Sequence, residues 1–69
     1  MKFDVYGRFE IEVLPEPAGW VAYRLGPGMR HRDYDIVFAS GVVEDDMESL
    51  LDEMFSDLAV PGQRVRRTD

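Results

Sequence analysis

The first part of the chain alternates between hydrophobic and polar positions over a long stretch, from Lys2 to Val13. The odd-numbered positions are mostly apolar and the even-numbered ones mostly charged; the apolar set is Phe3, Val5, Phe9, Ile11 and Val13. A period of two predicts an antiparallel strand with one face in the core and the other in water. Gly7 interrupts the apolar set. Because a strand of about twelve residues is long, we expect a bend or bulge at this glycine.

Two further strands are predicted, each preceded by a turn rich in proline and glycine. Residues 15–19 form a loop, since their two prolines cannot continue a central strand. The second strand is Trp20–Leu25, and its predicted inward residues are Val21, Tyr23 and Leu25. Another turn, residues 26–28, leads into a third strand over residues 29–38, and a break near Asp33 is left open. The best core candidates of this strand are Ile36 and Phe38.

The stretch from Val43 to Leu58 has a helical period instead. Apolar residues recur at steps of three and four and mark one face: Val43, Met47, Leu50, Leu51, Met54, Phe55 and Leu58. Asp45 and Glu48 have the spacing of a capping box, so the helix is predicted to begin at Asp45, within a residue or two. Pro61 and Gly62 end it.

This order predicts an α+β domain, in which a three-stranded antiparallel meander carries one C-terminal amphipathic helix on one face (β-β-β-α). Residues 1–62 form the domain. Residues 63–69 are predicted to be a flexible, Arg-rich tail, because Val65 is their one apolar residue. The predicted core combines the inward strand residues with the helix stripe: Phe3, Val5, Phe9, Ile11, Val13, Val21, Tyr23, Leu25, Ile36, Phe38, Met47, Leu50, Leu51, Met54, Phe55 and Leu58.

Three stretches resemble those of a family of short uncharacterised bacterial proteins: residues 1–9 (MKFDVYGRF), 20–28 (WVAYRLGPG) and 61–67 (PGQRVRR). The resemblance covers nearly the whole chain. That family is of unknown function, so the resemblance implies no activity and no site. More loosely, the plan of three strands and a helix is similar to that of HicB-type antitoxin domains, which is a likeness of fold and not of function.

Length and charge narrow the functional classes. A domain of 69 residues without cysteine cannot use disulfides or a thiolate zinc site, so it depends on good packing or self-association. A net charge of −6 makes it a poor general nucleic-acid binder, whereas its segregated acids and arginines favour a charged protein partner. The chain has no apolar run of about 18 residues for a membrane span. It begins in a strand pattern without a signal-like run, so a cytoplasmic location is expected.

The candidate chemistry is sparse. His31, Asp33 and Asp35 occupy alternate positions and could ligate a divalent cation from one face of a strand, but three such residues match this spacing readily by chance. We therefore predict no metal and no cofactor. His31 is the only histidine and has no evident nucleophile partner, so enzymatic activity is not predicted. The acidic helix face is interpreted as a solvated surface, with a docking surface or a mimic of nucleic-acid charge as the alternative.

We expect a small protein-interaction module, such as an adaptor, an inhibitor or an antitoxin-like protein, with an unidentified protein partner. The alternative is single-stranded nucleic-acid binding through the outer sheet face. Trp, Tyr and Arg dominate binding hot spots, so the predicted partner-binding residues on the outward sheet face are Tyr6, Arg8, Trp20 and Arg24. A homodimer is also expected, because four hydrophobic residues are left over once the core is filled: Trp20, Met29, Tyr34 and Val37.

Overall fold

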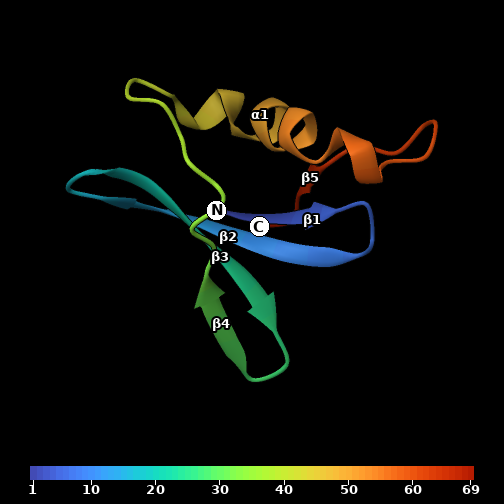
Figure 1. Cartoon of the computed structure of the whole chain (residues 1–69), viewed down its shortest axis with the longest axis horizontal. Coiled ribbons are helices and arrows are strands. Elements are labelled where there is room, and N and C mark those ends of the chain that lie inside the picture. The colour runs from blue at the N-terminus through green and yellow to red at the C-terminus, as the bar shows by residue number, and fades with distance from the viewer.

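The computed structural model describes all 69 residues and contains five strands and one α-helix (Figure 1). The strands are β1 (Lys2–Val5), β2 (Phe9–Glu16), β3 (Gly19–Gly26), β4 (Met29–Arg32) and β5 (Arg66–Arg67). The α-helix α1 (Met47–Met54) lies between two short 3₁₀ turns, η1 (Glu44–Asp46) and η2 (Ser56–Leu58). None of these helices has the length and hydrophobicity to cross a membrane.

The strands form one antiparallel sheet in the order β4-β3-β2-β1-β5, so the last strand of the chain lies beside the first. The helical segment covers one face of this sheet, and the opposite face is open (Figure 1). The predicted α+β class, with an antiparallel sheet and one helix near the C-terminus, is confirmed. The predicted number of three strands is too low, since the sheet has five.

The single long strand expected from Lys2 to Val13 is in fact a hairpin. Tyr6 and Gly7 have φ angles of 56° and 70°, and positive φ at two successive residues is typical of a tight hairpin turn. The turn brings Val5 opposite Phe9. Because three residues separate these two, both remain on the same face, and the alternating pattern continues through the turn without a change of phase.

The loop expected over residues 15–19 is shorter than predicted. β2 continues to Glu16, and only Pro17 and Ala18 form the turn into β3. Pro15 lies opposite Trp20 within the sheet. A proline is tolerated there because β1 pairs with β2 only as far as Glu12, so no neighbouring strand needs the missing N–H.

The phase predicted for the second strand is wrong. Residues paired across antiparallel strands share a face, and Val13 pairs with Ala22, which is 0% exposed. Ala22 and its alternate neighbours, Trp20 and Arg24, therefore face the helix. The residues expected inward lie on the other face of the sheet instead: Val21, Tyr23 and Leu25. Val21 is nevertheless buried as predicted, since it is only 8% exposed there.

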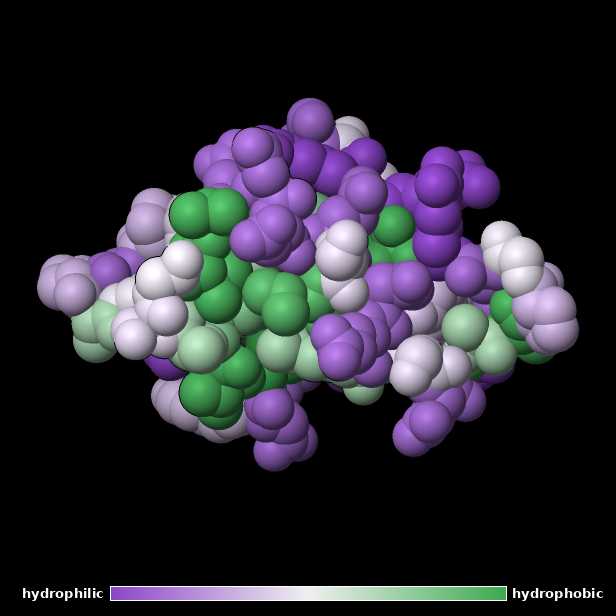
Figure 2. All heavy atoms as spheres, turned by 90° about the horizontal axis from the view of Figure 1, so that it is seen from above, coloured by the Kyte–Doolittle hydropathy of each residue, from purple (hydrophilic) through white to green (hydrophobic).

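The third strand ends much earlier than residue 38. β4 stops at Arg32, and the chain then crosses to the helix side as an irregular segment, residues 33–43, after the break anticipated near Asp33. Ile36 is buried and Phe38 packs against the core from this segment, not from a strand. Figure 2, which looks down on the helix side, shows hydrophobic residues gathered toward the end of the molecule where this segment and the β2–β3 turn lie.

The helix stripe is predicted in the correct phase, although the α-helix itself is short. Met47 and Leu51 are both 0% exposed, whereas Met54 and Leu58 at the far end are exposed. The expected capping box does not form, because neither η1 nor α1 has a side-chain cap. Glu48 instead accepts a hydrogen bond at 2.8 Å from the backbone N–H of Arg67.

The C-terminal residues, expected as a flexible tail, belong to the sheet. β5 pairs with β1 and places Arg66 opposite Asp4, and Val65 is 1% exposed. The backbone N–H of Lys2 donates to Asp69 at 3.1 Å. This bond, followed by that from the Arg67 guanidinium, lowers the pKa of Asp69 to about 2. The segment is held by the burial of Val65, by the short pairing of β5 with β1 and by these polar contacts.

The core lies between the helix and the covered face of the sheet. Its cluster of buried residues is Phe3, Val5, Tyr6, Ile11, Val13, Ala22, Ile36, Met47, Leu51 and Val65. Tyr6, Ala22 and Val65 are absent from the predicted core. Tyr23 and Leu25 were predicted in it, but their strand phase places them on the open face.

Candidate functional site

The four residues predicted to bind a partner do not share a face. Tyr6 lies in the β1–β2 turn and is only 7% exposed; its hydroxyl donates to the Asp52 carboxylate at 2.6 Å, with the Asp52 carbonyl oxygen at 3.0 Å. Burial and this hydrogen bond raise the pKa of Tyr6 to about 12. Arg8 is exposed in the same turn. Tyr6 therefore bonds to the helix between the helix and the sheet, and its side chain is not available on an outer surface.

Trp20 and Arg24 lie on the helix side of β3. The Trp20 indole N–H donates to the carbonyl oxygen of Val42 at 2.8 Å, which ties β3 to the loop before the helix. The Arg24 guanidinium lies 4.0 Å from the centre of the Phe9 ring and 3.3 Å from the Asp33 carboxylate. These contacts give both residues a role within the fold, and their predicted role in partner binding stays a prediction.

The three candidate metal ligands do not converge. The Asp33 carboxylate is engaged by Arg24 and also accepts the backbone N–H of Asp35 at 3.1 Å. His31 is exposed on β4, the edge strand of the sheet. No group of three His, Asp or Glu side chains is placed to hold a metal ion.

Part of the acidic helix face holds the C-terminal segment. Glu44 pairs with the Arg67 guanidinium at 2.9 Å, and Glu48 accepts the backbone N–H of the same residue. Hydrogen bonds to Glu44 and Asp69 raise the pKa of Arg67. Asp52 accepts from Tyr6 and from the backbone N–H of Val65. These carboxylates thus have structural partners.

The open face of the sheet carries three parallel rows of side chains. The central strand, β3, contributes the apolar row: Val21, Tyr23 and Leu25. β2 on one side contributes the acidic row, Glu10, Glu12 and Glu16, which Leu14 interrupts at the position opposite Val21. β4 on the other side contributes the basic row: Arg30 and Arg32. The strand register aligns the rows residue by residue. Leu25 lies opposite both Glu10 and Arg30, and Tyr23 lies opposite both Glu12 and Arg32.

Contacts between the rows hold the side chains in place. Arg30 pairs with Glu12 at 2.9 Å and lies 4.5 Å from the centre of the Tyr23 ring. The Tyr23 hydroxyl donates to Glu16 at 3.3 Å. The Arg30 side chain is still 50% exposed, so its charge remains accessible. These rows were not predicted from the sequence, because the alternation in β3 indicated that Tyr23 and Leu25 face the core.

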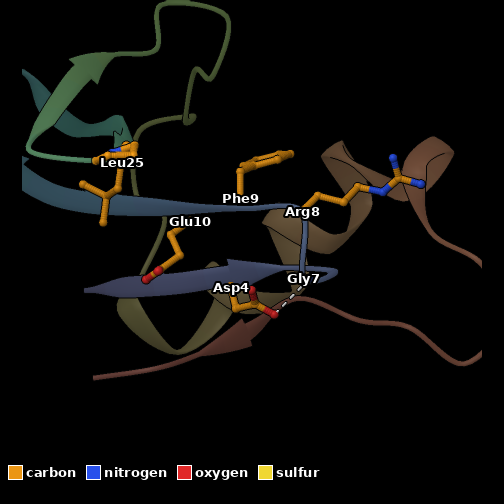
Figure 3. Close-up of a pocket in the computed structure, with 8 residues that line it drawn as sticks. Asp4, Gly7, Arg8, Phe9, Glu10 and Leu25 are labelled. Carbon is orange, nitrogen blue, oxygen red and sulfur yellow. Dashed lines mark hydrogen bonds between the residues drawn. The ribbon is translucent and has the colours of Figure 1, made fainter.

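A surface hollow of about 480 Å³ lies at one end of the open face, between the β1–β2 and β3–β4 turns. Asp4, Glu10 and Leu25 reach its wall from three adjacent strands (Figure 3). One Asp4 oxygen accepts the backbone N–H of Gly7 at 3.2 Å. Figure 3 shows Arg8 pointing away from the two carboxylates. The hollow thus extends the acidic row and suits a basic or polar group.

Of the hydrophobic residues left over from the predicted core, Trp20 is half-buried, whereas Met29, Tyr34 and Val37 are exposed. Arg32 lies 4.9 Å from the centre of the Tyr34 ring, so part of this exposed aromatic surface is covered by a cation. The homodimer expected from these residues stays a prediction.

Residues 1–69 match the family model described as a domain of unknown function (DUF7661). The chain belongs to this family. The DUF7661 match runs from β1 through β5, so it includes the segment that was expected to be a tail. No curated protein and no solved structure matches the chain. The similarity to HicB-type antitoxin domains and a bacterial origin stay predictions.

Proposed function

We propose that this DUF7661 domain is a protein-binding module whose contact surface is the open face of the sheet. The observation that carries the proposal is the arrangement of an apolar row between an acidic row and a basic row, all in register. A central apolar strip with charged flanks is the usual anatomy of a protein interface, because the strip supplies affinity and the flanks supply orientation. An adaptor, an inhibitor or an antitoxin-like protein would use such a surface.

A protein partner suits this face better than a nucleic acid. Single-strand binding needs several aromatic platforms along a basic groove, and β3 offers Tyr23 as the one aromatic side chain of its open-face row. Trp20 and Tyr6 are engaged on the helix side. The three carboxylates of the acidic row would repel phosphates that approach β2.

We also propose binding without catalysis. The hollow at the end of the open face is lined by two carboxylates and one guanidinium, and its lining includes no hydroxyl, thiol or imidazole group. Such a lining can hold a basic group, but it lacks the combination of nucleophile, base and orienting residue that hydrolytic chemistry uses.

Site-specific photo-crosslinking in the cells that express the protein tests this function. A photoreactive aromatic amino acid replaces Tyr23 on the open face, and a matched chain carries it at Ser49, which is exposed on the helix. We expect protein adducts from position 23 and far fewer from position 49. Absence of protein adducts at position 23, or equal adducts at both positions, would overturn the proposal.

A further inference from the structure

We infer that the open face binds a second copy of this chain, face to face and related by a two-fold axis; this inference rests on the proposed function of that face. The face has charges of both signs, and they are segregated by strand: acids on β2 and arginines on β4, with apolar β3 between them. A surface with this arrangement is complementary to itself in one orientation.

That orientation follows from the strand order. A two-fold axis that lies between the two faces and runs along β3 places β3 over the second copy's β3 and β4 over its β2. Such an axis keeps the strand directions of the two sheets aligned, which is one of the two common geometries of sheet packing. An axis across the strands would instead place arginines over arginines and acids over acids.

The register makes the match specific at the level of residues. Arg30 is level with Glu10 within one chain, and Arg32 is level with Glu12. An axis along β3 preserves these levels, so Arg30 faces the second copy's Glu10 and Arg32 faces its Glu12. The symmetry repeats both contacts on the other side of the axis, as in every isologous interface.

Two of these charges have no ion-pair partner within the chain. Arg30 already pairs with Glu12, but neither Glu10 nor Arg32 takes part in any of the five ion pairs. The second copy supplies an opposite charge to each of them. The apolar rows then meet in the middle, so Tyr23 and Leu25 lose the solvent that one face of each still contacts.

The pair is expected to be reversible and sensitive to salt. Only three strands of each sheet take part, so we expect the contact to be smaller than a standard interface, which buries roughly 800 Å² per partner. The charged rows lie at the rim, where added salt screens them. Dimerisation should therefore increase with protein concentration and decrease as the ionic strength rises.

Charge reversal with rescue tests the pairing. One variant carries Glu10→Arg and Glu12→Arg, and the other carries Arg30→Glu and Arg32→Glu. Each variant alone faces like charges across the axis, and we expect its Kd for self-association to rise at least about tenfold over that of the wild type. An equimolar mixture brings opposite charges together again and should restore the dimer. Sedimentation equilibrium over a range of concentrations measures self-association of the wild type, of each variant and of the mixture.

A matched control reverses two acids elsewhere. Glu53→Arg with Asp57→Arg changes the net charge as much as the β2 variant does, but both residues are exposed in the helical segment. This control should dimerise like the wild type. If the double variants unfold, as judged by circular dichroism, Glu10→Arg and Arg32→Glu are used singly, since these two parent residues form no ion pair within the chain.

The outcomes separate this inference from the proposed function. A wild-type chain that stays at 8.0 kDa at every concentration overturns the pairing, and so does a mixture that fails to restore it or a single variant that pairs normally. If the chain is monomeric but position 23 crosslinks to a different protein, the proposed protein-binding function stands and the inferred pairing with a second copy is wrong. If position 23 gives no protein adduct, both proposals fail.

Discussion

The hydroxyl of Tyr6 lies 2.6 Å from a carboxylate oxygen of Asp52, and the same oxygen accepts the backbone N–H of Val65 at 3.2 Å. One side chain of α1 therefore connects the β1–β2 turn to the segment that enters β5. These three parts of the chain are far apart in sequence. A single carboxylate thus links all three parts, beside the contacts that Glu48 and Glu44 make with Arg67.

Alkaline titration should reveal the Tyr6 contact. Its pKa is raised from 10.0 to about 12, first by burial and then by the hydrogen bond to Asp52. Because the pKa is higher in the folded than in the unfolded chain, the contribution to stability is complete below about pH 10 and is lost as the pH rises toward 12. Phenolate absorbance should show one of the three tyrosines ionising last. Tyr6→Phe should remove that step, and simultaneous ionisation of all three would contradict the assignment.

Leu51→Ala should reduce the free energy of unfolding by about 2–5 kcal/mol, since Leu51 is fully buried at the centre of the helix stripe and its loss leaves a cavity. Denaturant titration followed by circular dichroism measures the change. Ser49→Ala, an exposed position on the same helix, serves as the control and should stay within about 0.5 kcal/mol of the wild type. Similar values for the two variants would show that the helix packs in another phase.

The C-terminal segment should be protected from hydrogen exchange. The Val65 N–H is bonded to Asp52, and the Arg67 N–H is bonded to Glu48. Val65→Ala should cost about 2 kcal/mol, because it exchanges a buried isopropyl group for a methyl group. Arg64→Ala, at an exposed neighbouring position, should change stability little. Exchange of the Val65 amide at the rate of an unfolded peptide would show that the segment is loose.

Trp20 should affect stability and not partner binding. Trp20→Phe keeps an aromatic ring but removes the N–H that donates to Val42, which should cost about 1 kcal/mol. A thermal melt measures this loss. Crosslinking from the photoreactive residue at position 23 should be equally strong with Phe or Trp at position 20, because positions 20 and 23 lie on opposite faces of β3. Loss of the crosslink in a folded variant would place Trp20 in the interface after all.

The hairpin in the first part of the chain could not be distinguished from a long strand by its pattern. Val5 and Phe9 point to the same face whether the backbone runs straight or folds back through three residues. Periodicity therefore predicted the buried face correctly and the topology wrongly. The available signal was the glycine at position 7 in a strand of unusual length, since glycine adopts the positive φ of such a turn without strain.

The open face was missed because β3 has apolar residues in both phases. Trp20 and Ala22 face the core, while Val21, Tyr23 and Leu25 face outward, and hydrophobicity favours the second set. Ala22 is small enough to lie where the sheet packs closely, which a hydrophobicity pattern does not show. The charges on either side of β3 become a pattern only when the pairing with β2 and β4 is known. The candidate site therefore depends on register, which a single sequence does not specify.

The adjacency of β1 and β5 has a consequence for the connectivity of the chain. The amino group of Met1 donates to the carbonyl oxygen of Val13 at 3.0 Å and lies 3.7 Å from the Asp69 carboxylate. A short linker could therefore join residues 69 and 1, and new ends could be opened between Pro27 and Gly28 in an exposed turn. Such a circular permutant keeps every strand pair, so we expect it to form the same sheet with a different order of strands along the chain.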